Sequence, residues 1–239
     1  MKKNLGIAIG TAVAGWVCRT IISARRRRSS GTRMLESANR AIDTRAVAQP
    51  TRRDAAARVI IPTAMAAGGI TIFSKMSHGN TLRYTFVPTL AASWALYMLI
   101  LRRRGPDRER LMPLYFVSLA WQFVHFIEEN QTGFRYRWPV EIFGAEPYGD
   151  KQYVAINVLS YALFILGGVA LMVDRREFSL PAVFFAVMGV MFNGVQHPVY
   201  AWMARGYFPG LWTSTLDLAL GPILLKRLFE GPSAEPRLI

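Results

Sequence analysis

Two histidines and two glutamates interrupt segments of the chain that are otherwise apolar. Three of them, His125, Glu128 and Glu129, lie in the run WQFVHFIEEN at 121–130, at positions i, i+3 and i+4. In a helix this spacing places the three side chains on one face, where they can converge on a single point. Ionisable groups near the end of an apolar helix are costly to bury, which makes them candidates for function. The alternative is that the two glutamates only cap the helix at the membrane interface.

The second polar group lies in the run FNGVQHP at 192–198. Asn193 and His197 are four residues apart and therefore share one helix face. A lone histidine inside a membrane helix is more often a hydrogen-bonded packing residue than a ligand. Alternation of the apolar segments across the membrane, however, places His197 in the same leaflet as His125. We therefore expect the two histidines to share one site.

Two further polar residues fall in the outward halves of apolar segments, Asn157 and Asp217. An unpaired aspartate in hydrocarbon costs about 2.5 to 3.5 kcal/mol on insertion scales. We therefore expect Asp217 to face the interior of the bundle and to pair with His125 or His197. Asn157 and Asn193 are expected to support the site from behind through hydrogen bonds.

This set of side chains predicts a divalent metal ion. Two imidazoles and up to three carboxylates are ligands for zinc, and manganese or iron are alternatives. The single cysteine of the chain excludes a cysteine-rich cage, and a di-iron bundle would need at least one more carboxylate. Zinc would favour hydrolysis of an ester or amide in a lipid-like substrate, with Glu128, Glu129 and Tyr207 as catalytic groups. The predicted metal ligands are His125, Glu128, Glu129, His197 and Asp217.

The elements that position these residues are predicted from hydropathy. The 239 residues are 52% hydrophobic with a mean hydropathy of +0.21, and the apolar residues form long blocks separated by arginine-rich stretches. This distribution is typical of a polytopic membrane protein. The sequence thus predicts an all-α transmembrane helix bundle. Its five core spans are expected at 82–101, 111–130, 153–173, 180–203 and 211–229.

The segment 1–80 is expected to add one or two membrane-associated helices. The apolar stretch 5–23 precedes four arginines at 25–28, which oppose translocation, so we expect a retained helix rather than a cleaved signal. The stretch 29–50 predicts a helix on the membrane surface. Thr51 and Asp54 resemble a capping box before a short apolar block at 59–73. The chain is thus divided into 1–80, a bundle at 81–230 and a tail at 231–239.

The net charge of +14 is attributed to orientation in the membrane rather than to nucleic-acid binding. With the C-terminus in the cytoplasm, 20 of the 29 Lys and Arg residues lie inside, eight lie outside and Arg19 lies in a helix. Seven segments then satisfy the positive-inside rule, and five suffice if the first two lie on the surface. The arginines would meet anionic lipid headgroups. The aromatic-rich loop 131–152 is predicted to form an external cap on a multi-pass protein of the bacterial inner membrane.

Three short motifs occur in a fixed order: His125-Phe-Ile-Glu128-Glu129, then His197, then Tyr207-Phe-Pro209-Gly210. This order resembles the HXXEE domain family of bacterial membrane proteins, over about 82–229. The resemblance implies candidate residues and no reaction. In physical terms, Pro209 cannot continue a helix and Gly210 turns the chain into the next span. Tyr207 either closes the site from outside or anchors the chain at the interface.

Two other functions are consistent with the sequence. In the first, the site holds no metal: one of the adjacent carboxylates keeps a proton and a histidine shuttles it, as isomerisation of a lipid or sterol double bond requires. In the second, the protein is a non-enzymatic accessory subunit or a transporter with a proton-coupled carboxylate. The GxxxG spacing of Gly6 and Gly10 would suit a protein partner that docks on the N-terminal helix.

Overall fold

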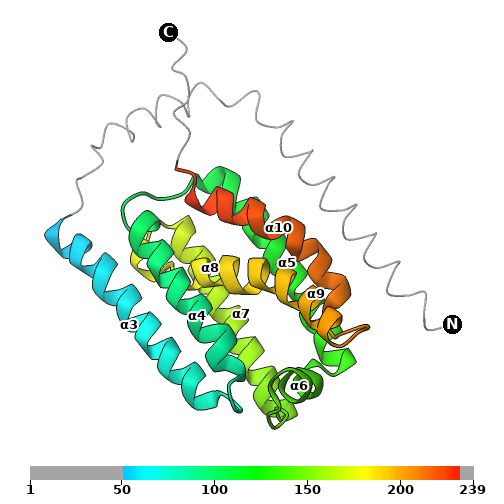
Figure 1. Cartoon of the computed structure of the whole chain (residues 1–239). Helices are drawn as coiled ribbons and strands as arrows, with labels where there is room; N and C mark the ends of the chain where they lie inside the picture. Colours follow the sequence, from blue (N-terminus) through cyan, green and yellow to red (C-terminus); the bar gives the residue numbers. More distant parts are fainter. Residues whose placement is uncertain (1–50, 232–239) are drawn as a thin grey trace, which may run out of the picture. The chain divides into compact units, whose positions relative to one another are not determined.

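The computed structural model describes residues 51–231, and within this range every regular element is a helix. Five helical segments are long and apolar enough to cross a membrane (Figure 1). The prediction of an all-α polytopic bundle is confirmed. The five segments are α3 (Arg52–Met76), α4 with its π-helical end η2 (Thr81–Leu101), α5 (Arg108–Thr132), α7 (Asp150–Met172) and the continuous run α8–η5–α9 (Leu180–Met203).

The set of spans differs from the prediction at both ends of the bundle. The helix α3 has 25 residues rather than the short block expected at 59–73, so it joins the five. The helix α10 (Leu211–Phe229) is not among them because Asp217, Lys226 and Arg227 lower its apolar character. It nevertheless packs along α5, η5 and α9 (Figure 1). The predicted helices at 5–23 and 29–50 lie outside the described residues.

The helix α5 carries the first motif, and both of its ends are fixed by local chemistry. At its start the side chain of Asp107 accepts a hydrogen bond from the backbone N–H of Arg110, at 3.3 Å. This is a standard N-cap, and it satisfies one of the amides that a helix leaves free at its beginning. At its end Gly133 has φ +83°, the left-handed conformation that commonly terminates helices. The motif therefore occupies the last two turns of a well-defined helix.

The helix α10 lies directly on η5 and α9 because glycines remove side chains from the contact. A Cβ atom added to Gly194 would lie 2.5 Å from the backbone nitrogen of Leu218. One added to Gly221 would lie 2.8 Å from the Cα atom of Met191. Neither approach is compatible with a larger residue. This close packing brings the start of α10 next to the second histidine of the motif set.

The fifth span contains a π-helical segment, η5 (Phe185–Phe192), between α8 (Leu180–Phe184) and α9 (Asn193–Met203). A π-turn adds a residue to each turn and so rotates the helix that follows relative to the helix before it; such turns are often found at functional sites. Here the α-helical geometry resumes at Asn193, which contacts Gln122 of α5. One turn later His197 contacts Phe134 of α6 and the carbonyl of Pro209, just before α10.

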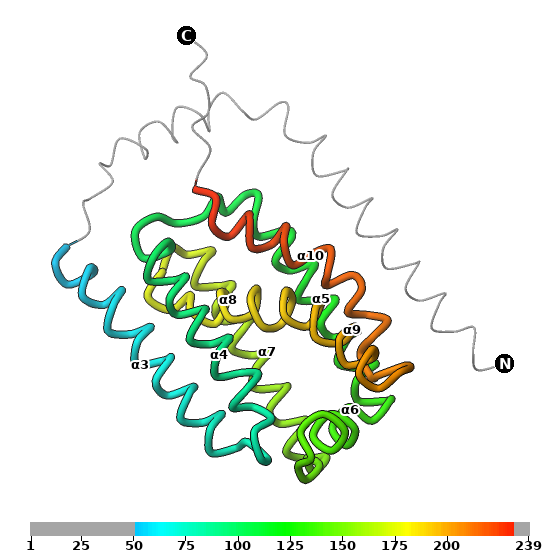
Figure 2. The backbone as a smooth tube through the Cα atoms, in the orientation of Figure 1, coloured from blue at the N-terminus to red at the C-terminus, as the bar shows by residue number. Residues whose placement is uncertain are grey.

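The segment 131–152 forms an ordered cap at one end of the bundle. It contains α6 (Phe134–Arg137) and η3 (Trp138–Ile142), shown in green at the lower end of the tube in Figure 2. The rings of Phe134 and Trp138 stack at 5.2 Å, and both are buried. Tyr148 stacks on His78 and hydrogen-bonds Thr81 at 2.6 Å, which ties the cap to the turn between α3 and α4. The cap closes the end of the bundle where the motifs lie.

Candidate metal centre

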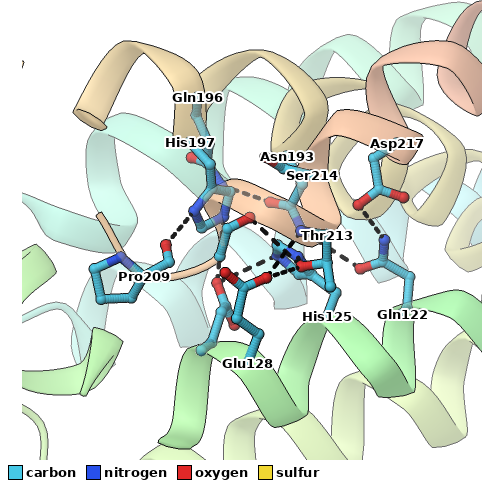
Figure 3. A network of polar contacts seen from close by, with 12 residues as sticks. Gln122, His125, Glu128, Asn193, Gln196, His197, Pro209, Thr213, Ser214 and Asp217 are labelled. Atoms are coloured by element: carbon cyan, nitrogen blue, oxygen red, sulfur yellow. Dashed lines mark hydrogen bonds and ion pairs between the residues drawn. The ribbon is translucent and has the colours of Figure 1, made fainter. Parts of the chain in front are cut away.

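Three of the predicted ligands converge in the interior of the bundle. His125 comes from α5 and His197 from α9 (Figure 3). Glu129 lies one turn after His125 on α5. The Nε2 atoms of His125 and His197 lie 3.5 and 3.3 Å from the same carboxylate oxygen, Oε1 of Glu129. The three side chains offer ligand atoms within 4.8 Å of one another, and all three are buried. The expectation that residues distant in sequence share one site is therefore met for this trio.

Hydrogen bonds to the other ring nitrogens fix which nitrogen of each histidine faces the centre. Nδ1 of His197 lies 2.7 Å from the carbonyl oxygen of Pro209, which can only accept, so Nδ1 carries the hydrogen. Nδ1 of His125 lies 2.7 Å from the hydroxyl oxygen of Thr213. That hydroxyl donates its own proton to Glu128 at 2.5 Å, so it accepts from His125. In their neutral forms both rings thus direct a bare Nε2 lone pair at Glu129.

This arrangement brings together three acceptors with no donor between them. Both Nε2 atoms are buried and have no hydrogen-bond partner among the described residues. Two lone pairs and a carboxylate oxygen repel one another, so the point between them requires a cation, either a metal ion or a proton. Two histidines and one glutamate form a ligand set of catalytic zinc sites. Backbone or side-chain oxygens that hold the opposite ring nitrogens are typical of metal-binding histidines.

Tyr153 is a fourth participant that the sequence did not reveal. Its hydroxyl, near the start of α7, donates to Oε2 of Glu129 at 2.9 Å and so leaves Oε1 to face the histidines. Tyrosines are frequent at the ends of membrane helices, so this one had no distinguishing feature. The only available signal was its spacing of four residues from Asn157, whose side chain donates to the carbonyl of Tyr153 at 3.0 Å.

Glu128 points away from the trio and binds the start of α10. Its carboxylate accepts hydrogen bonds from the backbone N–H groups of Trp212 and Thr213, at 3.2 and 2.8 Å. It also accepts from the hydroxyls of Thr213 and Tyr207, the latter at 2.9 Å. A carboxylate at this position satisfies the free amides of the helix start and complements the helix dipole. Glu128 thus contacts His125 only indirectly, because both bind the hydroxyl of Thr213. It is not among the converging ligands.

Tyr207 lies with Glu128 rather than with the trio. Burial raises the pKa of Tyr207, so its hydroxyl remains protonated and donates to the carboxylate. Neither residue lines the cavity described below. The catalytic roles predicted for Glu128 and Tyr207 therefore have no contact with the trio to support them.

Asp217 is buried but does not meet a histidine, which corrects the predicted pairing. Its Oδ2 atom accepts a hydrogen bond from the side-chain amide of Gln122 at 2.9 Å, and its Oδ1 atom has no hydrogen-bond partner among the described residues. The physical reason is the antiparallel course of α5 and α10. Thr213, at the start of α10, already lies against His125, so Asp217, one turn later, faces Gln122, nearly one turn earlier on α5.

Asn193 also contacts residues near the trio without being one of the converging ligands. Its amide nitrogen lies 3.4 Å from the side-chain oxygen of Gln122, and its own oxygen accepts from Gln196 at 2.5 Å. Both predicted asparagines, Asn157 and Asn193, therefore contact neighbours of the ligands.

The YFPG motif is explained by the room that the two imidazoles need. Gly210 has φ +85°, and a Cβ atom there would lie 2.5 Å from Cε1 and Nδ1 of His197 and 3.0 Å from Cε1 of His125. A side chain at 210 would therefore be strained by its backbone and would clash with the rings. The preceding residue, Pro209, supplies the carbonyl that holds His197. The three sequence motifs thus meet in one place.

A cavity of about 80 Å³ adjoins the trio and includes His125 and Glu129 in its wall. It lies between α4, α5, α7 and the η5–α9 segment, beneath the cap. Its apolar wall is largely aromatic and includes Phe86, Phe134, Trp138, Tyr148, Tyr153, Tyr161 and Phe164. Its polar wall includes Gln122, Asn157, Ser160, Asn193 and Gln196.

Comparison with known proteins identifies one family. Residues 116–224 match the family model HXXEE, described as a protein of unknown function with HXXEE motif. No curated protein and no solved structure matches the chain. The matched range is narrower than the 82–229 that the motifs suggested, and it omits α3 and α4. It contains all three motifs and every residue of the trio, so the resemblance to the HXXEE family that the motifs suggested is matched by the family model over this part of the chain.

Proposed function

We propose that the protein is a metal-dependent membrane enzyme in which His125, Glu129 and His197 hold one divalent ion. The observation that carries the proposal is the convergence of two imidazole lone pairs and one carboxylate oxygen on a point to which no described residue donates a hydrogen bond. Zinc suits two imidazoles and one carboxylate, and its fourth position would be free for water or substrate. Manganese and iron remain alternatives with the same ligands.

The reaction proposed is hydrolysis of an ester or amide bond, with water consumed and an acid and an alcohol or amine released. A bound zinc ion would polarise the carbonyl group and make a water molecule more acidic. The chain contributes orientation. Pro209 and Thr213 hold the two rings in one tautomer, and Tyr153 holds the glutamate. Buried ligands that are fixed in this way need little rearrangement on metal binding.

The proposed substrate is lipid-like because the cavity lies inside a bundle of membrane-spanning helices and is mostly apolar. The proposed location is the bacterial inner membrane, as a multi-pass protein with its basic helix ends in the cytoplasm. Those ends include Arg102, Arg103 and Arg104 after η2, and Lys226 and Arg227 in the last turn of α10.

A second candidate is metal-free proton transfer, as in isomerisation of a lipid double bond. The specific observation in its favour is that one oxygen of Glu129 lies within 3.5 Å of both Nε2 atoms. A proton placed there would relieve the same repulsion that a metal ion relieves. It would also be available for transfer to a substrate in the cavity.

Elemental analysis of the protein purified in detergent separates the two candidates. We expect about one divalent ion per chain, and we expect its loss from both His125→Ala and His197→Ala, because each variant removes one of three ligands. The matched control is His78→Ala, which changes the third histidine of the chain, in the turn before α4. Metal content that is unchanged in both ligand variants would discard the metal proposal. A metal-free wild type would favour proton transfer.

A further inference from the structure

Three side-chain amides in the bundle interior form a continuous row of hydrogen bonds, which we call the amide ladder: Gln122, Asn193 and Gln196. Gln196 donates to Asn193 at 2.5 Å, Asn193 donates to Gln122 at 3.4 Å, and Gln122 donates to Asp217 at 2.9 Å. The row connects α9 to α5 and α5 to α10 (Figure 3). All three amides line the cavity beside the metal centre.

The direction of the ladder is fixed by the groups at its two ends. At one end the indole N–H of Trp138, which can only donate, bonds the hydroxyl of Tyr200 at 3.3 Å. Tyr200 in turn donates to the amide oxygen of Gln196 at 3.3 Å. At the other end Oδ2 of Asp217, in the ionised form of the carboxyl group, can only accept from Gln122. The oxygen and nitrogen atoms of the three amides, which are otherwise interchangeable, are thereby assigned.

With this direction, the amide ladder has more N–H groups than its own hydrogen bonds use. Each primary amide has two N–H groups and one oxygen. In the ladder each oxygen already accepts one hydrogen bond, whereas each nitrogen donates only one. One N–H group on each of the three residues therefore has no hydrogen-bond partner within residues 51–231. Such donors on a cavity wall match a ligand that brings an acceptor oxygen.

The remaining walls restrict the charge of that ligand. Among the described residues that line the cavity, Glu129 is the only one with a formal charge, and none is Lys or Arg. In the metal-free protein a phosphate or carboxylate group would be buried there with no cation to compensate it, which is costly. The aromatic wall suits a hydrocarbon chain. The walls thus match the carbonyl-bearing end of an uncharged, largely apolar molecule, because a cavity of about 80 Å³ is too small to enclose a long chain.

We propose that Gln122, Asn193 and Gln196 bind the carbonyl oxygen of an uncharged ester- or amide-bearing amphiphile next to the metal centre. The inference rests on the proposed function for its reaction and names the substrate class of that site. In that reaction the fixed N–H groups would stabilise negative charge on the carbonyl oxygen as water adds. Binding itself needs no metal, so the two proposals can fail separately.

The test is ligand binding to the full-length protein in detergent, with metal present and after its removal by a chelator. Three probes share one chain length: decanamide, decane and decyl phosphate. We expect decanamide to raise the unfolding temperature in a saturable way in both preparations. We expect decane to act less in both preparations because it lacks the acceptor. We expect decyl phosphate not to act on the metal-free protein, because it adds a charge that no cation there compensates.

Variants of the ladder make the assignment specific. Gln196→Met keeps the volume and removes the donor, and Gln196→Glu keeps the acceptor for Tyr200 but removes the N–H group. Each should weaken decanamide binding by about tenfold, as expected for loss of a buried neutral hydrogen bond, and leave decane unaffected. The control is Val199→Met, on the exposed side of the same helix.

The outcomes separate the two proposals. Equal responses to the three probes, or decanamide binding that survives both Gln196 variants, would overturn the donor assignment even if the protein contains metal. Selective decanamide binding by a protein that contains no metal would support the ladder and remove the metal reaction. Tight binding of decyl phosphate to the metal-free protein would replace the uncharged substrate by an anionic one and also overturn the inference.

Discussion

Two neighbouring spans bury polar side chains in different ways. Each of α4 and α5 has four buried polar residues on one face, which we call the α4 row and the α5 row. The α4 row is Thr81, Thr85, Thr89 and Ser93, and the α5 row is Ser118, Gln122, His125 and Glu129. In α4, Thr85, Thr89 and Ser93 donate to backbone carbonyls four residues earlier in the same helix. In α5, the three larger side chains reach residues of α7, α9 and α10.

The difference shows that buried polarity alone does not mark a functional site in a membrane helix. A hydroxyl can satisfy itself on its own helix at little cost. The polar atoms of an imidazole or a carboxylate lie farther from the backbone and cannot all be satisfied within the same helix. They must find hydrogen-bond partners on other helices. As a result, the Nε2 atoms of His125 and of His197 from α9 both face the carboxylate of Glu129, and no described residue donates a hydrogen bond to either nitrogen. The family match includes α5 from residue 116 onward and omits α4.

The largest effect on stability is expected at Gly210, which packs against the rings of His125, in the α5 row, and of His197. Gly210→Ala would place a Cβ atom against both imidazole rings in a left-handed backbone conformation. We expect a loss of about 3 kcal/mol in unfolding free energy, from strain and displacement of the rings, together with loss of bound metal. Gly206→Ala, with nothing within 4 Å of its Cβ position, is the control for chemical unfolding in detergent. If Gly210→Ala changed neither the unfolding free energy nor the metal content, the rings would have room to move.

The next effect concerns Asp217, the acceptor for Gln122 of the α5 row. Asp217→Asn keeps an oxygen for the amide of Gln122, whereas Asp217→Leu leaves a buried donor unpaired. We expect the leucine variant to be less stable than the asparagine variant by about 2 kcal/mol in chemical unfolding. Equal stabilities would indicate that water satisfies Gln122, and the contrast between α4 and α5 would then be weaker at this level of the bundle.

Adjacent glutamates give a third test, because they separate binding from stability. Glu129→Gln should abolish metal binding and leave the metal-free protein at least as stable, since its new N–H group can donate to a histidine nitrogen that now lacks a donor. Glu128→Gln should keep the metal but lower the unfolding free energy by about 1 kcal/mol, because a charged acceptor at the start of α10 becomes neutral. Metal analysis and chemical unfolding on the same preparations measure both. The reverse pattern would exchange the roles assigned here.

These roles also show how far the sequence could lead. Hydropathy predicted the all-α bundle. The spacing of His125 with its glutamates, together with the leaflet of His197, predicted a site of five ligands, three of which converge in the structure. It could not separate Glu128 from Glu129, because both lie within one turn of His125 and differ by about 100° around the helix. Only the position of α10 decides which of them faces His197.

Other parts of the site had no sequence signal. The carbonyl of Pro209 belongs to the backbone, which every residue has, and Tyr153 resembles any interfacial tyrosine. The π-helical segment η5, which precedes Asn193 and His197, follows from packing rather than from hydropathy. Asp217 was assigned to a histidine because its register against α5 was unknown.

The smallest effect is expected in the α4 row. Ser93→Ala removes a hydroxyl that donates at 2.6 Å to the carbonyl of Thr89, and a helical carbonyl also accepts from the backbone N–H four residues later. No buried group is left unpaired, so we expect a change in unfolding free energy within about 0.5 kcal/mol and unchanged metal content. Chemical unfolding and elemental analysis beside the wild type measure both. A loss of metal from Ser93→Ala would mean that the α4 hydroxyls are coupled to the centre, and the distinction between self-satisfied and cross-helix polarity would fail.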